Sequence, residues 1–417
     1  MLVTLGLTAA ACTTTSPNRA SGEPPVLGQQ SGTPAVEGQP APTGTGQLDA
    51  VSCAGADRCW AVGTPGPGSA STITSSPTSS STPSSSPPPS PATVIDATVD
   101  GGQTWVAQPL HLTSAPALTA ISCPSARLCM AVGLSGSASA GIVLTTHDAG
   151  SSWRVVAIPA GATVISGVEC ASAVDCTVIA TDGTTFWSAH SNDFGRTWQR
   201  GGNLPAGLQD AASLTCVTGG SCLVTGITAT TAGHGQGVIV ISADGGATWT
   251  AANVPAKTGL LQSVVCATVT SCMAAGTTSS TISAIVPAKG EMLTSQDGGQ
   301  TWRRSPAPAS IDDVYGIACP SPRICAMVGT KWVGHPAVGT GGVAQSRDGG
   351  TSFTAARTEY TPLPLTALAC PGVRACIGVG GDTLARITLT GTKSASTSTT
   401  PTTPSGGVHR PGLNGRA

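Results

Sequence analysis

Fourteen of the fifteen cysteines in this 417-residue chain share one spacing, with five residues between the two members of each pair. The pairs are Cys53/Cys59, Cys123/Cys129, Cys170/Cys176, Cys216/Cys222, Cys266/Cys272, Cys319/Cys325 and Cys370/Cys376. Zinc sites favour C-x2-C to C-x4-C knuckles and redox dithiols favour C-x-x-C, and this chain has neither spacing. We therefore expect seven local disulfides and no metal. Because so many disulfides need an oxidising compartment, we expect the protein to be extracytoplasmic.

The other side chains that could carry chemistry are few and scattered. The sequence contains no H-E-x-x-H, no G-x-S-x-G and no phosphate loop. Its histidines and glutamates lie far apart, at His111, His147, His190, His234, His335, His409, Glu23, Glu37, Glu169, Glu291 and Glu359. We expect no cofactor and no catalytic residues, because the sequence has few glutamates that could form a catalytic carboxyl pair and no His next to a Cys.

An eight-residue pattern, hydroxyl-x-Asp-x-Gly-x-hydroxyl-aromatic, occurs six times, and we call it the octapeptide turn. Its copies begin at Thr98, Thr146, Ser191, Ser242, Ser295 and Ser346, with aromatic residues 45 to 53 positions apart. Their aspartates are Asp100, Asp148, Asp193, Asp244, Asp297 and Asp348. An Asp can bond backbone N–H groups of its own turn, and Gly supplies a positive φ. Each copy therefore predicts a structural turn between two strands.

This pattern resembles the Asp box, or BNR repeat, of the sialidase-like β-propellers. In that superfamily the box joins the third and fourth strands of a blade, away from the catalytic centre. The resemblance implies an all-β fold, and the period near 50 residues matches four-stranded antiparallel blades. Seven cysteine pairs, each expected to bracket a hairpin, predict seven blades. A disulfide across so short a loop contributes roughly 2 to 2.5 kcal/mol by the chain-entropy argument.

Composition divides the chain into four parts. Residues 1–12 are similar to the end of a bacterial lipoprotein signal, in which Cys12 is lipidated; the alternative is a free Cys12. Residues 13–47 have the Pro/Gly/Thr-rich composition of a linker. Residues 48–391 form the predicted propeller, with a Ser/Pro-rich insert at 69–91 that we expect to be disordered. Residues 392–417 are typical of a disordered tail.

The seventh predicted blade, which opens at Leu365, has no octapeptide turn. If a segment before Leu48 supplied its outer strand, the chain ends would interrupt the one hairpin where the turn is missing. The segments that could do so are 25–27 and 34–37. Closure would remove the exposed sheet edges. The alternative is a seventh blade of three strands.

Architecture of this kind does not decide activity. Sialidases need an arginine triad, a Tyr–Glu pair and an F/Y-R-I-P motif, and this motif is absent. The chain is also similar to the single seven-bladed propellers of photosystem II assembly factors, which bind proteins and catalyse nothing. We expect no nucleic-acid partner, because only 9% of the residues are charged and the net charge is -1. We predict a monomeric scaffold at the cell envelope that binds a protein or glycan and touches the membrane only through a lipid anchor; the alternative is a glycan-active hydrolase.

The loops that vary between the repeats indicate on which face of the ring a ligand would bind. Hairpins of the cysteines and the octapeptide turns should emerge on one face of the ring, which leaves the variable loops on the opposite face. On that face, side chains able to make specific contacts concentrate in one sector, at Asp312, Asp313, Lys331, Trp332, His335, Arg357, Glu359 and Tyr360. The alternative is that these residues are solvated and share no target.

Overall fold

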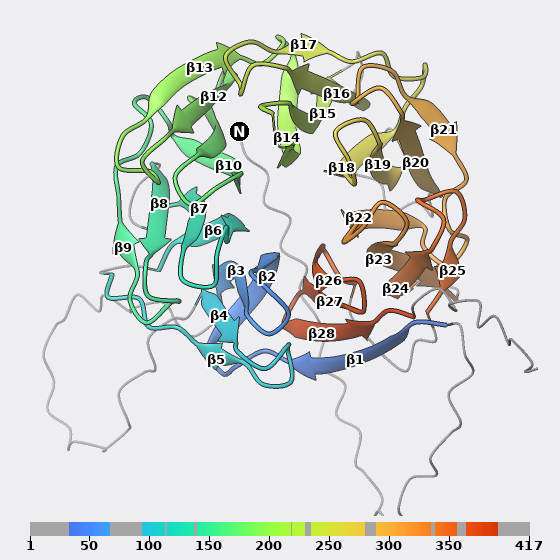
Figure 1. The fold of residues 1–417 in the computed structure, drawn as a ribbon, viewed down its shortest axis with the longest axis horizontal. Coiled ribbons are helices and arrows are strands. Elements are labelled where there is room, and N and C mark those ends of the chain that lie inside the picture. Colours follow the sequence, from blue (N-terminus) through green and yellow to red (C-terminus); the bar gives the residue numbers. More distant parts are fainter. Residues whose placement is uncertain are drawn as a thin grey trace, which may run out of the picture. The chain divides into compact units, whose positions relative to one another are not determined.

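A computed structural model confirms an all-β propeller of seven four-stranded antiparallel sheets arranged in a ring (Figure 1). It describes residues 33–66, 94–112, 115–136, 140–217, 219–229, 235–279, 289–334, 338–356 and 364–390. All of them belong to one compact unit, Gly32–Ala417. The expected insert at 69–91, the tail 392–417 and Cys12 lie outside the described residues.

Each sheet is one blade, and its four strands lie side by side, ordered from the centre of the ring to its rim. The innermost strands are β2 (Thr45–Cys53), β6 (Ala117–Ser122), β10 (Val164–Cys170), β14 (Leu208–Cys216), β18 (Leu260–Cys266), β22 (Asp313–Ala318) and β26 (Ala367–Gly372). The second strands are β3 (Cys59–Pro65), β7 (Cys129–Leu134), β11 (Cys176–Thr181), β15 (Cys222–Ala229), β19 (Cys272–Thr277), β23 (Cys325–Val333) and β27 (Ala375–Gly380). Blade 1 opens with β2 and blade 7 with β26.

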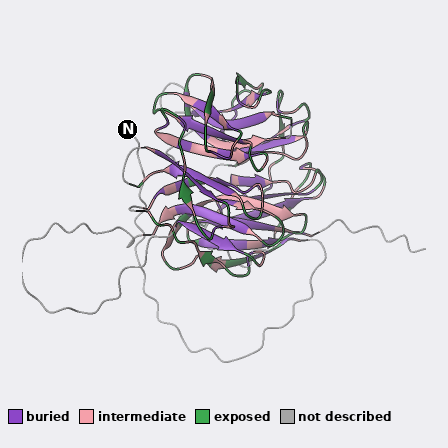
Figure 2. Ribbon diagram, turned by 60° about the vertical axis from the view of Figure 1, so that its left-hand side comes forward, coloured by how far each residue is buried: buried purple, intermediate pink, exposed green. Residues whose placement is uncertain are grey.

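The third strands are β4 (Ile95–Thr98), β8 (Gly141–Thr146), β12 (Phe186–Ser191), β16 (Gly235–Ser242), β20 (Gly290–Ser295), β24 (Val338–Ser346) and β28 (Thr383–Thr388). The outermost strands are β5 (Val106–Ala107), β9 (Arg154–Val155), β13 (Gln199–Asn203), β17 (Thr250–Ala251), β21 (Arg303–Ser305), β25 (Thr354–Ala355) and β1 (Ala35–Pro40). The second and third strands are largely buried, whereas β9, β17 and β25 are exposed along their length (Figure 2).

Blade 7 is completed by the N-terminal strand β1, which pairs antiparallel with β28 from Ala35↔Thr388 to Pro40↔Thr383. The candidate segment at 34–37 thus supplies the first half of this strand, which continues to Pro40, and the three-stranded alternative does not apply. Val36 is buried in this blade. Two further backbone bonds, from Ala41 N to Asp382 O and from Leu48 N to Gly381 O, fasten the start of the chain to its end. The start of the chain therefore closes the ring, and β1 covers the outer edge of β28.

The hydrophobic core lies between the blades. Seven clusters of buried side chains each join two neighbouring sheets, and the cluster of Trp60 and Leu144, for example, joins blades 1 and 2. Most of their members are Ala, Val, Leu and Ile. Because each blade buries both faces against its neighbours, no blade has a core of its own.

Candidate functional site

All seven cysteine pairs are disulfides, as the spacing predicts, and each links the first and second strands of a blade near their hairpin. The octapeptide turns connect the third and fourth strands at the same end of the blade. In blade 2, for example, Cys129 pairs directly with Thr146, the first residue of the turn. The turn also bonds to the cysteine hairpin, because Ala149 N donates to Arg127 O at 3.1 Å. The repetitive features therefore share one face of the ring.

The cysteine pair of blade 7 also encloses its hairpin, but this hairpin is tighter than those of the other blades. Its disulfide forms between Cys370 and Cys376 as predicted, but the two strands continue beyond it, and their last paired residues are Gly372 and Ala375. Cys376 is therefore the second residue of β27, whereas Cys370 falls in a bulge of β26. Because blade 7 has no octapeptide turn, Cys376 lies opposite Ile387 of β28 and not opposite a hydroxyl residue. The buried Cys376 thus packs in the apolar cluster between blades 6 and 7.

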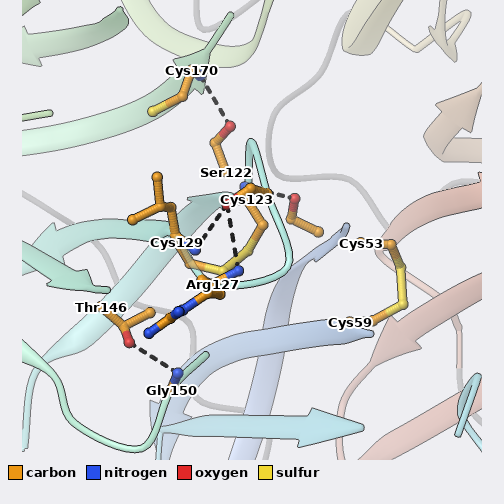
Figure 3. Close-up of a disulfide and its surroundings, with 12 residues drawn as sticks. Cys53, Cys59, Ser122, Cys123, Arg127, Cys129, Thr146, Gly150 and Cys170 are labelled. Carbon is orange, nitrogen blue, oxygen red and sulfur yellow. Dashed lines mark hydrogen bonds between the residues drawn. A yellow bond between two sulfur atoms is a disulfide. The ribbon is translucent and has the colours of Figure 1, made fainter. Parts of the chain in front are cut away.

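Hydrogen bonds within each octapeptide turn converge on its Asp and on its buried first hydroxyl. In blade 2, Asp148 accepts from Thr146 Oγ1 (2.8 Å), Ser152 N (2.9 Å) and Ser152 Oγ (2.6 Å). Thr146 Oγ1 in turn accepts from Gly150 N at 2.9 Å (Figure 3). The bond from Ser152 Oγ does most to lower the pKa of Asp148, to about 2. Both carboxylate oxygens of Asp148 thus accept hydrogen bonds from residues of its own turn.

The same arrangement is found in the other five turns. The hydroxyl of the seventh residue contributes most to lowering the pKa to about 2 for Asp100, Asp193, Asp244 and Asp297. At Asp348 burial acts to raise the pKa, but hydrogen bonds from Ser352 and Ser346 outweigh it, and the pKa is lowered. These carboxylates stay ionised at any physiological pH.

Replacing Thr146 by Val should destabilise the protein by about 1 to 3 kcal/mol. Val keeps the shape of Thr146 but leaves the buried N–H of Gly150 without an acceptor. Urea unfolding of the variant measures this cost. The control is Thr351→Val, at an exposed hydroxyl of the blade 6 turn, which should change stability far less. Equal stability of Thr146→Val and the parent would contradict the role of this hydroxyl.

On the opposite face, four of the predicted binding residues form one network in blade 6. Lys331 Nζ bonds Asp312 Oδ1 at 3.0 Å, and the backbone N–H of Trp332 donates to Asp312 Oδ2 at 2.9 Å. The indole Nε1 of Trp332 donates to Asp313 Oδ2 at 2.6 Å. The start of β22 and the end of β23 meet because the two strands are antiparallel. Asp312 therefore holds the backbone of Trp332, and Asp313 holds its half-buried indole.

The other four predicted residues of this surface, His335, Arg357, Glu359 and Tyr360, lie outside the described residues. The network is thus the part of the predicted sector that the structure brings together. Lys331 forms an ion pair with Asp312, and its ammonium also donates to Ala309 O at 2.9 Å, whereas Asp313 accepts, among the described residues, only from the neutral indole. What the network offers a ligand is a rigid aromatic surface at the tip of the hairpin β23–β24.

A second candidate site, which the sequence analysis did not single out, is a cavity of about 510 Å³ at the centre of the ring. It is lined by residues of all seven innermost strands. In six of these strands a β-bulge skips one residue, four positions before the first Cys. The skipped residues, which all line the cavity, are Asp49, Thr119, Ser166, Ala212, Gln262 and Tyr315. Bulges redirect side chains, so these positions form a ring facing the cavity.

The sequence carried a signal for these bulges. In the repeated frame L-x-x-[VI]-x-C, for example Leu118 and Ile121, two buried apolar residues are three positions apart. Strict alternation would place them on opposite faces of a strand. Both pack against blade 1 in the same buried cluster, and they can share this face only if the strand contains an extra residue between them, which is the bulge.

Two carboxyls, Asp49 from blade 1 and Glu169 from blade 3, line the central cavity, whose described lining contains no basic side chain. Burial raises the pKa of Glu169 to about 7, and the described residues offer it no hydrogen-bond donor. Burial also raises the pKa of Asp49, against a smaller lowering by the amide of Gln47. The charged side chains in the described lining of the cavity are therefore carboxyls, and their negative charge increases as Glu169 ionises near neutral pH.

Glu169→Gln should stabilise the protein at pH 8 by about 1 to 2 kcal/mol, after allowing for water in the cavity, and hardly at all at pH 5. A raised folded-state pKa favours folding below the unfolded pKa near 4.5, and this contribution is lost as the pH rises through about 7. Denaturant unfolding at both pH values measures it. The control is Asp182→Asn, because the pKa of Asp182, lowered to about 2 mainly by the hydroxyl of Thr184, lies outside this window. An equal effect of Glu169→Gln at both pH values would contradict the assignment.

In the described ranges, no group of three or more His, Cys, Asp or Glu side chains is arranged to hold a metal ion. The part of the chain that the structure covers also contains no helix with the length and apolarity needed to cross a membrane.

Comparisons with known proteins find the fold and no sequence family. No protein-family model and no curated protein matches the chain. Among solved structures, a YCF48 protein bound to D1 peptide has a TM-score of 0.59 at 16% identity, covering 86% of this chain and 100% of its own. YCF48 from Cyanidioschyzon merolae has a TM-score of 0.56 at 12% identity, covering 85% and 98%. The GH74 enzyme of Niastella koreensis has a TM-score of 0.55 at 13% identity, covering 82% of this chain and 52% of its own.

Proposed function

We propose that this protein is a non-catalytic binding scaffold that works outside the cytoplasm and recognises a protein or glycan ligand on the variable face of blade 6. The observation that carries the proposal is the network in which Asp312 and Asp313 hold Trp332 in one orientation at the tip of a hairpin. Rigid aromatic side chains held in this way are the usual anchors of protein interfaces. The residues His335, Arg357, Glu359 and Tyr360 would extend the same surface.

Three further lines support parts of this proposal. Seven disulfides favour an oxidising compartment. The octapeptide turns have the sequence of Asp boxes, and their Asp side chains accept hydrogen bonds from the backbone and hydroxyls of their own turn, as a structural role requires. One of the structurally similar proteins is a propeller bound to a peptide. Lipidation of Cys12 would hold the scaffold at the membrane surface and leave the ring free to bind.

Trp332→Ala should weaken binding of the partner about tenfold or more, which corresponds to about 1.4 kcal/mol. The partner would first be captured from envelope extract with the folded chain and identified, and its affinity then measured by calorimetry. The matched control is Trp198→Ala, which removes a similarly half-buried indole from the octapeptide-turn face. If Trp198→Ala weakens binding and Trp332→Ala does not, the ligand binds the opposite face.

A hydrolase is the second candidate, because two carboxyls from different blades line the central cavity. A glycosidase needs its two carboxyls about 5 to 10 Å apart. Asp49 lies four residues before its cysteine and Glu169 one residue before its own, an offset of about 10 Å along the strand direction alone. They also come from non-adjacent blades. This separation favours binding over hydrolysis. Release of reducing sugar from xyloglucan or sialoside, abolished by Glu169→Gln, would reverse the order of the two proposals.

A further inference from the structure

Shallow grooves lie between the octapeptide turns of blades 2 and 3 and between those of blades 4 and 5, and the two grooves differ in charge. The groove between blades 2 and 3 has a volume of about 330 Å³ and is lined by His147, Arg154 and Arg196, among other residues. His147 is the second residue of its turn, Arg154 directly follows the turn, and Arg196 is the sixth residue of the next turn. Two octapeptide turns of neighbouring blades and the strand β9 thus direct basic side chains into one space.

The equivalent groove between blades 4 and 5 provides an internal reference. It is about 440 Å³ in volume, and Ala243, Thr250 and Gln300 occupy the positions of the three basic residues. Repeat geometry therefore creates the groove, but it does not require the charges. Among the five pairs of neighbouring octapeptide turns, only the pair of blades 2 and 3 has basic residues at all three positions.

The two arginines in this groove have no protein partner among the described residues. No ion pair or hydrogen bond to a described residue engages either guanidinium, and both side chains are exposed. One carboxylate, Asp148, also lines the groove, but its oxygens already accept from Thr146 and Ser152. The guanidinium donors remain available for an external anion.

Phe194 adds a second irregularity at the same place. It occupies the fourth position of its turn, where the other copies have Gly or Ala, and it adopts a φ of 57°. A bulky residue is rare in this left-handed region, because its side chain strains the backbone. Its buried ring packs against the imidazole of His147, with ring centres 5.3 Å apart and planes at 76°. The strained residue thus forms the wall that positions one of the three basic groups.

We propose that the groove between blades 2 and 3 binds an oxyanion of the phosphate type, held by Arg154 and Arg196 with His147 as a third donor. Guanidinium groups bind such anions through paired, charge-assisted hydrogen bonds. The groove is large enough for one anionic group and open to solvent at the rim. The same chemistry is presented by free phosphate and by the headgroup of an anionic lipid. This site is independent of the blade 6 surface and does not rest on the proposed function.

Calorimetric titration of the full chain with inorganic phosphate, and sedimentation with phosphatidylcholine vesicles with and without phosphatidylglycerol, test the proposal. The variant Arg154→Gln/Arg196→Gln should bind at least about tenfold more weakly than the parent in whichever arm shows binding. The control Arg303→Gln/Arg323→Gln removes two exposed arginines elsewhere, and so matches the change in net charge. It should bind like the parent.

The two arms identify the source of the anion. Binding of phosphate alone indicates a soluble ligand, and binding only to phosphatidylglycerol vesicles indicates a lipid headgroup; either result supports the site if the Arg154/Arg196 variant loses it. Equal binding by the parent and this variant, equal losses in the two variants, or no binding in either arm would overturn the proposal. Melting curves of both variants establish that they are folded.

Discussion

A chain that begins at Thr45 should be less stable by at least about 3 kcal/mol than one that begins at Thr33, because only the longer chain contains β1. Without β1, blade 7 loses a six-residue antiparallel pairing and the burial of Val36. Burial of one Val contributes about 1.5 to 3 kcal/mol, and the backbone hydrogen bonds add to it. Differential scanning calorimetry of the two chains measures the loss.

The shorter chain should also associate, since removing β1 exposes the edge of β28 to other molecules. Light scattering at increasing protein concentration would detect this. A point variant separates the contribution of the core from that of the edge: Val36→Asp places a charge among buried residues, whereas Glu37→Gln changes an exposed neighbour on the other side of the same strand. Equal melting temperatures for the two truncated chains would show that the ring does not depend on β1.

This closing strand illustrates what the sequence could not decide. The segment Ala35–Pro40 contains one buried apolar residue among Gly, Gln, Glu and Pro, so its own pattern does not predict a strand. It becomes a strand because β28 presents an unpaired edge beside the start of the chain. The sequence could predict that an edge needed covering, from the missing seventh octapeptide turn, but it could not choose between the two segments available.

The strands of the blades themselves could be predicted more fully, because each blade repeats the same markers. In blades 1 to 6 the cysteine pair fixes, to within about one residue, where the first strand ends and the second begins, and the octapeptide fixes the end of the third. In blade 2 these markers are adjacent in the sheet, since Cys129 pairs with Thr146. Blade 7 lacks the octapeptide, and there the strands run past Cys370 and Cys376 to a tighter hairpin that the cysteine spacing alone does not reveal.

The bulges of the innermost strands were not predicted, although the three-residue spacing of apolar residues such as Leu118 and Ile121 departs from strict alternation. The candidate sites were predictable to different extents. Hairpin geometry placed Asp312 and Lys331 on the same face, but only the structure shows that they bond each other. Glu169 could not be recognised, because its environment depends on seven strands that converge at the centre of the ring. A carboxyl with a raised pKa is therefore a property of the closed ring and of no single repeat.

Full reduction of the seven disulfides should lower the melting temperature by more than about 20 °C, or unfold the protein at room temperature. Each loop contributes about 2 kcal/mol by the chain-entropy argument, and seven contribute on the order of 15 kcal/mol, which is comparable to the whole stability of a typical domain. Aromatic residues are only 3% of the chain, and Ala is frequent between the blades, so the core has little surplus to offset the loss.

Reduction should also loosen the octapeptide turns, because in blades 1 to 6 the backbone of the cysteine hairpin accepts a hydrogen bond from the octapeptide turn of the same blade, as Arg127 O does from Ala149 N. Melting curves with and without a phosphine reductant, at one scan rate, measure the effect, and thiol titration verifies that reduction is complete. The paired variant Cys216→Ala/Cys222→Ala removes one bridge and should cost about 2 kcal/mol, which tests whether the contributions add. An unchanged melting temperature in the fully reduced protein would mean that inter-blade packing alone holds the ring.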